Sequence, residues 1–145
     1  MSTIREAGPY VFYPDGAAAL DWLGRVFGFQ EVARWVDDTG EVQEAETRAG
    51  PMTVMVGAGR AAKEGEGAGQ LFIIVVDDVE AMHRRVTAAS LKAAAPKEKP
   101  WGPRTFAVKD PWGYTWDFWQ RVKPFVDGTG GLREIRAATH LAKGE

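Results

Sequence analysis

The stretch from Gly102 to Gln120, GPRTFAVKDPWGYTWDFWQ, holds the strongest structural signal in the chain. Two runs rich in β-branched and aromatic residues flank the tetrapeptide DPWG, whose proline and glycine are typical of a tight turn. The stretch therefore predicts strands over 104–110 and 114–120. It also holds three of the six tryptophans. A core strand does not need so much aromatic surface, and the role of Asp117 among the rings becomes the central question.

Outward from this stretch, the chain predicts one order of elements twice: a strand, a helix and then three strands. The halves align at a spacing of 62 residues, at which Asp15 matches Asp77 at the start of a helix. Asp77 or Asp78 begins the second helix. In the first half the strands are predicted at 8–14, 29–36, 42–48 and 51–57, with a helix at 16–28. In the second half a strand is predicted at 71–76, a helix at 77–90 and a short edge strand at 91–96.

A change in composition separates the two halves. Residues 58–69 are mostly glycine, alanine and charged residues, which predicts a flexible linker. One domain over residues 1–122 is therefore expected, built from modules at about 8–57 and 70–122. Residues 123–145 form a C-terminal tail that is broken by proline and glycine and could end as a short helix.

Composition limits the classes of function. The 145 residues suffice for one domain with a core, and a hydrophobic fraction of 45% is that of a globular protein. The net charge is −2 and basic residues are scattered, which argues against nucleic-acid binding. No long apolar run or signal peptide is visible, so no membrane partner is expected. The absence of cysteine excludes disulfides and thiolate sites and favours a cytoplasmic location.

Three stretches resemble the vicinal oxygen chelate superfamily, also called the glyoxalase/bleomycin-resistance/dioxygenase family. They are PYVFYPDGAAALDWLGRVFGFQEV, IIVVDDVEAMHRRV and the opening stretch, with its pattern G-x-R-x-F-x-V-x-D-P-x-G. The resemblance covers about residues 8–122. It implies an α+β fold of two tandem β-α-β-β-β modules, whose mixed sheets curl into a cup. It also implies a homodimer.

Enzymes of this family commonly hold a divalent metal inside the cup. Carried over one at a time, their ligand positions fall at Gly8, at Leu71 (or Gln70 if the register slips by one), near Val54 and at Asp117. Only the last is a usable ligand, and a hard divalent ion needs several oxygen or imidazole donors. We therefore expect no metal and no cofactor. The chain then resembles the metal-free branch, whose members sequester antibiotics such as bleomycin.

Strand alternation predicts which side chains line the cup, because successive residues point to opposite faces. If Asp117 faces the cup, Thr115 and Trp119 do too, while Trp116 and Phe118 belong to the core. The same rule places further residues on the cup face: Gly8, Tyr10 and Phe12; Met52, Val54 and Val56; Leu71, Ile73 and Val75. Trp35 and Trp101 flank strands and are expected at the rim. The predicted ligand-binding residues are Tyr10, Phe12, Trp35, Trp101, Asp117 and Trp119, and the predicted partner is a small planar or cationic molecule.

Three roles remain open for Asp117: a metal ligand without partners, a general base with a pKa raised by burial, and a polar anchor for a ligand. Glu44 and Glu46 alternate on one strand face, which is either the cup mouth or a solvated surface.

The favoured function is metal-free binding of a small molecule, with antibiotic resistance as its setting. The alternative is an enzyme of the same fold, lyase, isomerase or dioxygenase-like, using Asp117 as base or an unrecognised metal site. A third possibility is a decayed pocket and a partner surface.

Overall fold

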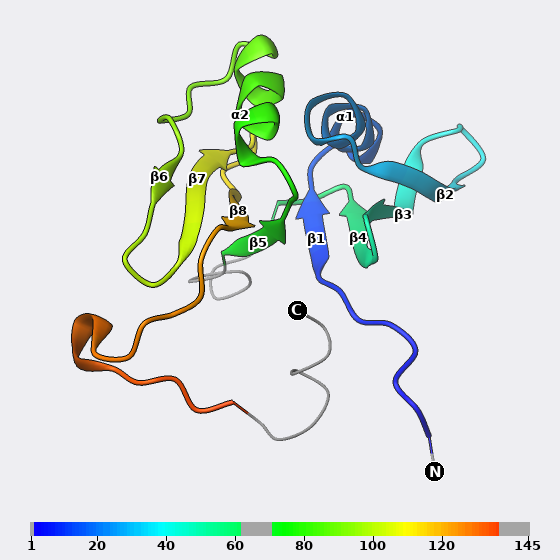
Figure 1. Ribbon diagram of the computed structural model, residues 1–145. Helices are drawn as coiled ribbons and strands as arrows, with labels where there is room; N and C mark the ends of the chain where they lie inside the picture. Colours follow the sequence, from blue (N-terminus) through cyan, green and yellow to red (C-terminus); the bar gives the residue numbers. More distant parts are fainter. Residues whose placement is uncertain (1, 62–70, 137–145) are drawn as a thin grey trace.

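A computed structural model of the chain describes residues 2–61 and 71–136. The described part of the first half is a four-stranded sheet with a helix on one face (Figure 1). Its elements are β1 (Tyr10–Tyr13), α1 (Gly16–Trp22), which continues as the π-helical turn η1 (Leu23–Phe27), β2 (Gln30–Val36), β3 (Val42–Ala49) and β4 (Met52–Ala58).

The second half repeats this architecture. A second four-stranded sheet carries one helix on the corresponding face (Figure 1). Its elements are β5 (Phe72–Val75), α2 (Val79–Ala88), β6 (Lys97–Glu98), β7 (Pro103–Lys109) and β8 (Thr115–Arg121), followed by the 3-10 turn η2 (Thr129–Gly131). The predicted order of a strand, a helix and three strands is confirmed in both halves, as is the α+β class.

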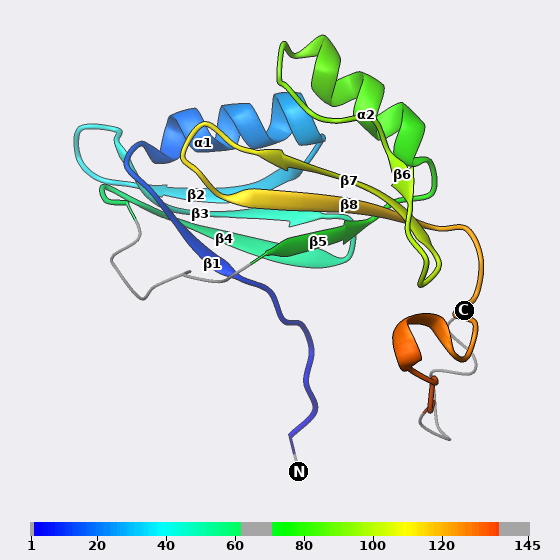
Figure 2. The ribbon, with the colours of Figure 1, turned by 90° about the vertical axis from the view of Figure 1, so that its left-hand side faces the viewer.

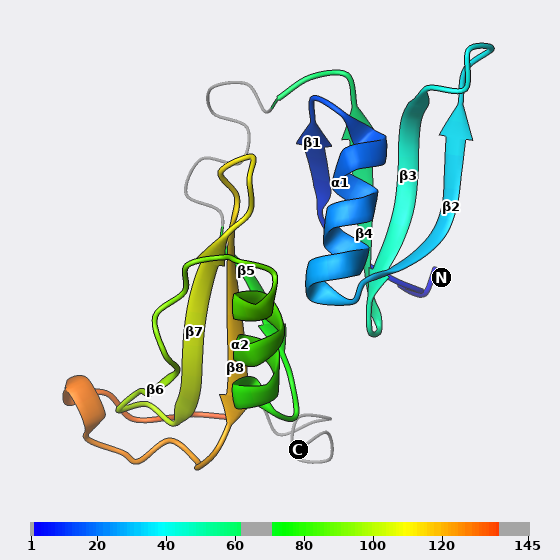
Figure 3. The ribbon, with the colours of Figure 1, turned by 90° about the horizontal axis from the view of Figure 1, so that it is seen from above.

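Both sheets have the same topology. Their strand orders are β1-β4-β3-β2 and β5-β8-β7-β6, and in each sheet the first strand pairs with the last in parallel. The sheets lie side by side with both helices on one side (Figures 2 and 3). The two sheets do not close into a barrel. Each sheet carries a helix on one face only, and its other face has no helix. No helix in the described ranges is long and apolar enough to cross a membrane.

Matching side-chain caps begin the two helices. Asp15 accepts a hydrogen bond from the Ala18 amide, and Asp78 accepts one from the Ala81 amide, each at 3.0 Å. The caps at 15 and 78 lie 63 residues apart, so the predicted match of Asp15 with Asp77 at a spacing of 62 was wrong by one at the helix starts. Gly28 ends the first helix at φ 78°, a left-handed conformation that glycine adopts without strain.

Side chains from both halves join the modules. Arg85 of α2 donates to the Val26 carbonyl at 3.0 Å and also reaches the carbonyls of Gly24 and Arg25 at the end of η1. These bonds place a positive charge against the carbonyls at the end of the first helix, where it interacts favourably with the helix dipole. The Tyr114 hydroxyl donates to the Phe12 carbonyl at 2.7 Å. Residues far apart in the sequence therefore hold the two sheets in a defined relation.

Two local predictions were wrong or fall beyond the described ranges. Residues 91–96 are irregular, and the edge strand is the two-residue β6 that follows them. The run LKAAAP lacks the β-branched residues that favour strands. Residues 132–136 are not helical. Most of the predicted linker, 62–69, and the remaining tail, 137–145, lie outside the described residues.

Candidate functional site

The sheet faces that carry no helix form the candidate site (Figure 2). On β8 the predicted alternation is confirmed. Trp116 and Phe118 are buried in the core at 0% and 1% exposure, whereas Asp117 and Trp119 are only partly buried, on the opposite face. On β5 the same alternation leaves Ile73 and Val75 exposed on the open face.

The prediction for β4 was wrong. Val54 and Val56 were expected in the cup, but both are fully buried on the side of the helix. The open face of β4 instead carries Met55 and Gly57, which pair with Tyr10 and Phe12 of β1 respectively. A shift of one residue moves every side chain of a strand to the other face. Met52 is partly buried and packs against the core.

The one-residue shift on β4 also changes which residue of the first sheet corresponds to Asp117. Tyr10 pairs with Met55 in the first sheet. Ile73 lies 63 residues after Tyr10 and takes the same place on the first strand of the second sheet, where it pairs with Asp117. The counterpart of Asp117 is therefore Met55 and not Val54.

A metal centre does not fit the side chains that are present. Within residues 2–61 and 71–136, no group of three or more His, Cys, Asp or Glu could hold a metal ion. At the first-strand position, a Cβ on Gly8 would lie 1.6 Å from the Thr53 carbonyl oxygen, so this backbone leaves no room for any side chain. Met55 supplies only a thioether, which hard divalent ions do not prefer, and Leu71 supplies no donor.

Aromatic and acidic side chains share the open face of the first sheet. The rings of Tyr10 and Phe12 lie 5.0 Å apart. Glu44 pairs with Gly57 on one side and with Trp35 on the other, so these residues continue the same face toward the edge strand β2. Burial and the nearby negative charge of Glu44 raise the pKa of the Tyr10 phenol.

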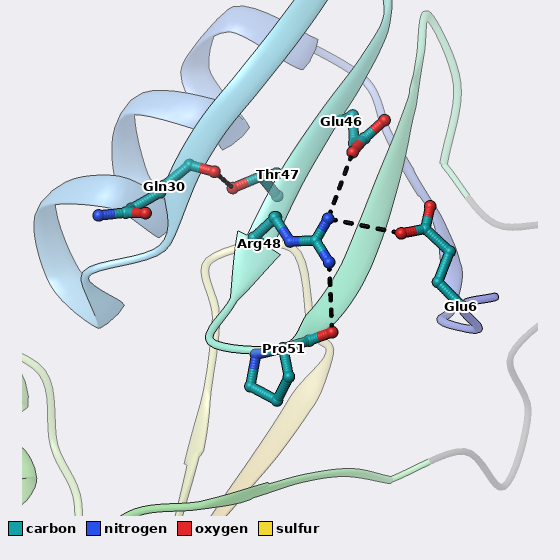
Figure 4. Close-up of polar contacts among 6 residues, drawn as sticks. All are labelled: Glu6, Gln30, Glu46, Thr47, Arg48 and Pro51. Carbon is teal, nitrogen blue, oxygen red and sulfur yellow. Dashed lines mark hydrogen bonds and ion pairs between the residues drawn. The ribbon is translucent and has the colours of Figure 1, made fainter.

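An arginine lies beside the second glutamate of this face (Figure 4). Arg48 Nη1 lies 3.4 Å from Glu6 Oε2 and 4.0 Å from Glu46 Oε2, and Nη2 donates to the Pro51 carbonyl at 3.4 Å. Thr47, the next residue on β3, is buried, and its hydroxyl donates to the Gln30 carbonyl. Glu46 therefore lies on the open face beside a positive charge, whereas Thr47 helps to hold β2 against β3.

The second sheet holds a hollow of about 270 Å³ next to Asp117. Two lysines, Lys97 and Lys99, line it together with the carboxylate. The hollow thus brings both signs of charge to one place. The remaining lining residues are Ala94, Ala95, Thr105, Phe106 and Ala107.

The predicted tryptophans occupy separate places. Trp119 lies beside Val75 and opposite Thr105 on the second sheet. Its indole nitrogen is buried and has no hydrogen-bond partner within the described ranges. Trp35 is half exposed on the first sheet, and Trp101, equally exposed, lies in the turn between β6 and β7. The structure therefore divides the predicted site residues between two neighbouring sheet faces.

Sequence reasoning missed the role of Asp110. This buried carboxylate accepts hydrogen bonds from the Tyr13 hydroxyl and the Trp116 indole, both at 3.1 Å, and from the Trp112 and Tyr114 amides, both at 3.0 Å. Burial raises its pKa, while these hydrogen bonds act in the opposite direction. Its place at the first position of the DPWG turn was the available signal. Asp110 connects the modules and does not face the site.

Comparisons with known proteins agree with this architecture. Residues 6–118 match the sequence model of the Glyoxalase/Bleomycin resistance protein/Dioxygenase superfamily. TioX from Micromonospora sp. ML1 is 30% identical, with a TM-score of 0.69 over 81% of this chain and 99% of that chain. TnmS3, an antibiotic binding protein from Streptomyces sp. CB03234, is 20% identical, with a TM-score of 0.65 over 83% and 99%. A bleomycin-binding protein complexed with bleomycin is 19% identical, with a TM-score of 0.60 over 81% and 99%.

Proposed function

The chain belongs to the glyoxalase/bleomycin resistance protein/dioxygenase superfamily, and on this premise we propose that it is a metal-free binding protein that sequesters a planar small molecule. One observation carries the proposal. The open sheet faces present aromatic and apolar side chains, Tyr10 and Phe12 on one sheet and Ile73 and Trp119 on the other, while the positions that correspond to metal ligands hold Gly8, Met55 and Leu71. Apolar walls with a few polar groups are typical of small-molecule sites.

Antibiotics are the favoured class of ligand. Two proteins that share the fold, TnmS3 and the bleomycin-binding protein, bind antibiotics. Flat rings such as Trp119 and Trp35 can stack on planar heteroaromatic groups. The polar groups of the hollow, Asp117 and the two lysines, would orient such a ligand through hydrogen bonds. A cytoplasmic location belongs to the same proposal.

An enzyme of the same fold is the second candidate. The observation in its favour is that Asp117 lines a hollow together with Lys97 and Lys99, which are groups able to accept or donate a proton. Incubation of the protein with a candidate ligand separates the two functions, because a binding protein returns the ligand unchanged and an enzyme releases a product.

The first test concerns metal. We expect purified protein to retain less than one divalent ion per ten chains after dialysis, because Gly8, Met55 and Leu71 offer no hard donor. Elemental analysis for zinc, nickel, iron and manganese measures this directly. One equivalent of any of these ions per chain would contradict the metal-free proposal.

The second test concerns ligand binding. Bleomycin is expected to quench tryptophan fluorescence, and Trp119→Ala should weaken its binding by about 1–3 kcal/mol, the scale of a truncated aromatic anchor. Trp119→Phe is the matched control, because it keeps a ring and should retain most of the affinity. Calorimetric titration measures both variants. If Trp119→Ala binds as tightly as the wild type, the ligand does not use this face.

The third test concerns assembly. A homodimer belongs to the proposal, because β5 and the residue before it expose an apolar strip that a second copy would cover: Leu71, Ile73 and Val75, at 44–51%. Light scattering after size exclusion should give twice the mass of one chain. Ile73→Lys should yield monomers, while Ile4→Lys, in the exposed N-terminal segment, should not. A wild-type protein with the mass of one chain would refute the dimer.

A further inference from the structure

On the first sheet, an arginine side chain of the protein lies against an aromatic ring. The guanidinium carbon of Arg60 lies 3.7 Å from the centroid of the Phe12 ring. This distance is well inside the limit of about 6 Å within which a cation is attracted to the face of a ring. Arg60 follows the end of β4, next to β1. Its side chain therefore covers part of the open face.

A glycine makes the ring platform possible. A Cβ on Gly57 would lie 2.5 Å from Tyr10 Cε1 and 2.9 Å from Phe12 Cδ1, closer than Cβ atoms come to other atoms. Because Gly57 has no side chain, both rings can lie against the backbone of β4. The two rings, tilted by 51° to each other, thus fill the space above Gly57 and form an aromatic surface on the open face.

A carboxylate completes the surroundings of the guanidinium. Glu44 lies directly across from Gly57 in the sheet, and its charge raises the pKa of the Tyr10 phenol. The Arg60 charge lowers the pKa of the same phenol, in opposition to Glu44. The phenol therefore lies within electrostatic reach of both charges. The Phe12 ring, the Glu44 carboxylate and the Arg60 guanidinium therefore all lie close to the Tyr10 side chain.

A second ring lies at the far end of the same row. Register places Phe12, Gly57, Glu44 and Trp35 side by side on four consecutive strands. With strands about 4.8 Å apart, the row is about 14 Å long. The indole of Trp35 is half exposed. A flat cation that took the place of the Arg60 guanidinium on Phe12 would lie in the same row as the Glu44 carboxylate and the Trp35 indole.

We propose that this row is a binding site for planar amidinium or guanidinium cations, and that Arg60 is an internal competitor for it. The inference rests on the proposed function, since it assumes that the open sheet faces bind small molecules, and it adds the chemical class of one ligand group. An incoming cation stacks on Phe12, pairs with Glu44 and displaces the Arg60 side chain. A cation can bind only while the Arg60 side chain is away from Phe12. The longer Arg60 covers the ring, the lower is the apparent affinity of the protein for the cation.

Benzamidine is a suitable probe, with benzamide as its neutral counterpart of nearly the same shape. Arg60→Ala should increase the affinity for benzamidine by about 3–10-fold and leave benzamide unchanged. Adding Glu44→Gln to Arg60→Ala should lower the benzamidine affinity about tenfold, again without effect on benzamide. Arg48→Ala is the matched control, because it removes the same charge from the same sheet face without uncovering Phe12. Calorimetric titration measures all four proteins.

The outcomes separate cleanly. An unchanged or weaker benzamidine affinity in Arg60→Ala would overturn the inference, as would an equal gain in Arg48→Ala, which would indicate a general effect of net charge. Parallel changes for benzamide would exclude recognition of the cation. Bleomycin titrations of the same proteins test the proposed function separately. If bleomycin binds but the expected changes in benzamidine affinity are absent, only the proposed role of Arg60 is refuted. If those changes occur but bleomycin does not bind, the cation site is supported and bleomycin is not the ligand.

Discussion

Replacing Trp116 with alanine is expected to destabilise the fold by about 3–5 kcal/mol, the usual cost of removing a large buried aromatic side chain. The ring is 0% exposed and packs against Phe27, Phe29 and Phe72 at centroid distances of 4.6–5.5 Å. Its indole nitrogen also donates to Asp110. Urea denaturation followed by circular dichroism measures the loss without depending on tryptophan fluorescence.

Trp101→Ala is the control for this substitution, because Trp101 is half exposed in a turn. It should change the free energy of unfolding by less than about 0.5 kcal/mol, as surface substitutions usually do. Trp116→Ala and Trp119→Ala also test the assignment of the two strand faces. If Trp116→Ala abolished ligand binding in a stable protein, while Trp119→Ala unfolded it, the two faces of β8 would be assigned the wrong way round.

Replacing Asp110 with alanine should have an effect of similar size. The substitution leaves the Tyr13 hydroxyl, the Trp116 indole and two backbone amides without their acceptor. Each buried donor without a partner costs about 1–3 kcal/mol, and partial rearrangement suggests a total of about 3–5 kcal/mol. Because Tyr13 belongs to the first module, the joint between modules should loosen as well. Urea denaturation measures the loss, with Asp38→Ala in an exposed turn as control.

The pH dependence gives an independent check on Asp110. Burial raises its pKa in the folded protein, so the folded state binds this proton more tightly than the unfolded chain does. The resulting stability is fully present below the unfolded value of about 3.9 and is lost as the pH rises through the folded value. The free energy of unfolding of the wild type, relative to Asp110→Asn, should therefore fall as the pH rises from 3.5 to 7. A relative stability that rises with pH would show that the hydrogen bonds outweigh burial.

Much of the architecture follows from local sequence. Caps at Asp15 and Asp78, the stop at Gly28 and the DPWG turn each act on neighbouring residues, so the order of elements can be predicted without tertiary contacts. Alternation along β8 places Trp116 correctly for the same reason, because Trp116 and Phe118 alternate there with Thr115 and Asp117. The shortage of hard metal donors can be seen from residue types alone.

The faces of β4 could not be predicted in this way. The run PMTVMVG has apolar residues at both odd and even positions, so its pattern does not show which set faces the helix. Parallel pairing of Tyr10 with Met55 decides the question and buries Val54 and Val56. That pairing depends on residues about 45 positions apart. A local pattern contains no information about such a register.

The candidate site depends on tertiary structure even more. Its aromatic residues divide between two sheets, Arg60 lies over Phe12, and two lysines lie near Asp117. The hydrogen bond between Tyr13 and Asp110 joins residues 97 positions apart. The sequence by itself determined the type and order of the elements, because backbone propensities and caps act over a few residues. Only the tertiary structure decided which charges and rings meet, because those contacts form between strands that pair over long distances in the chain.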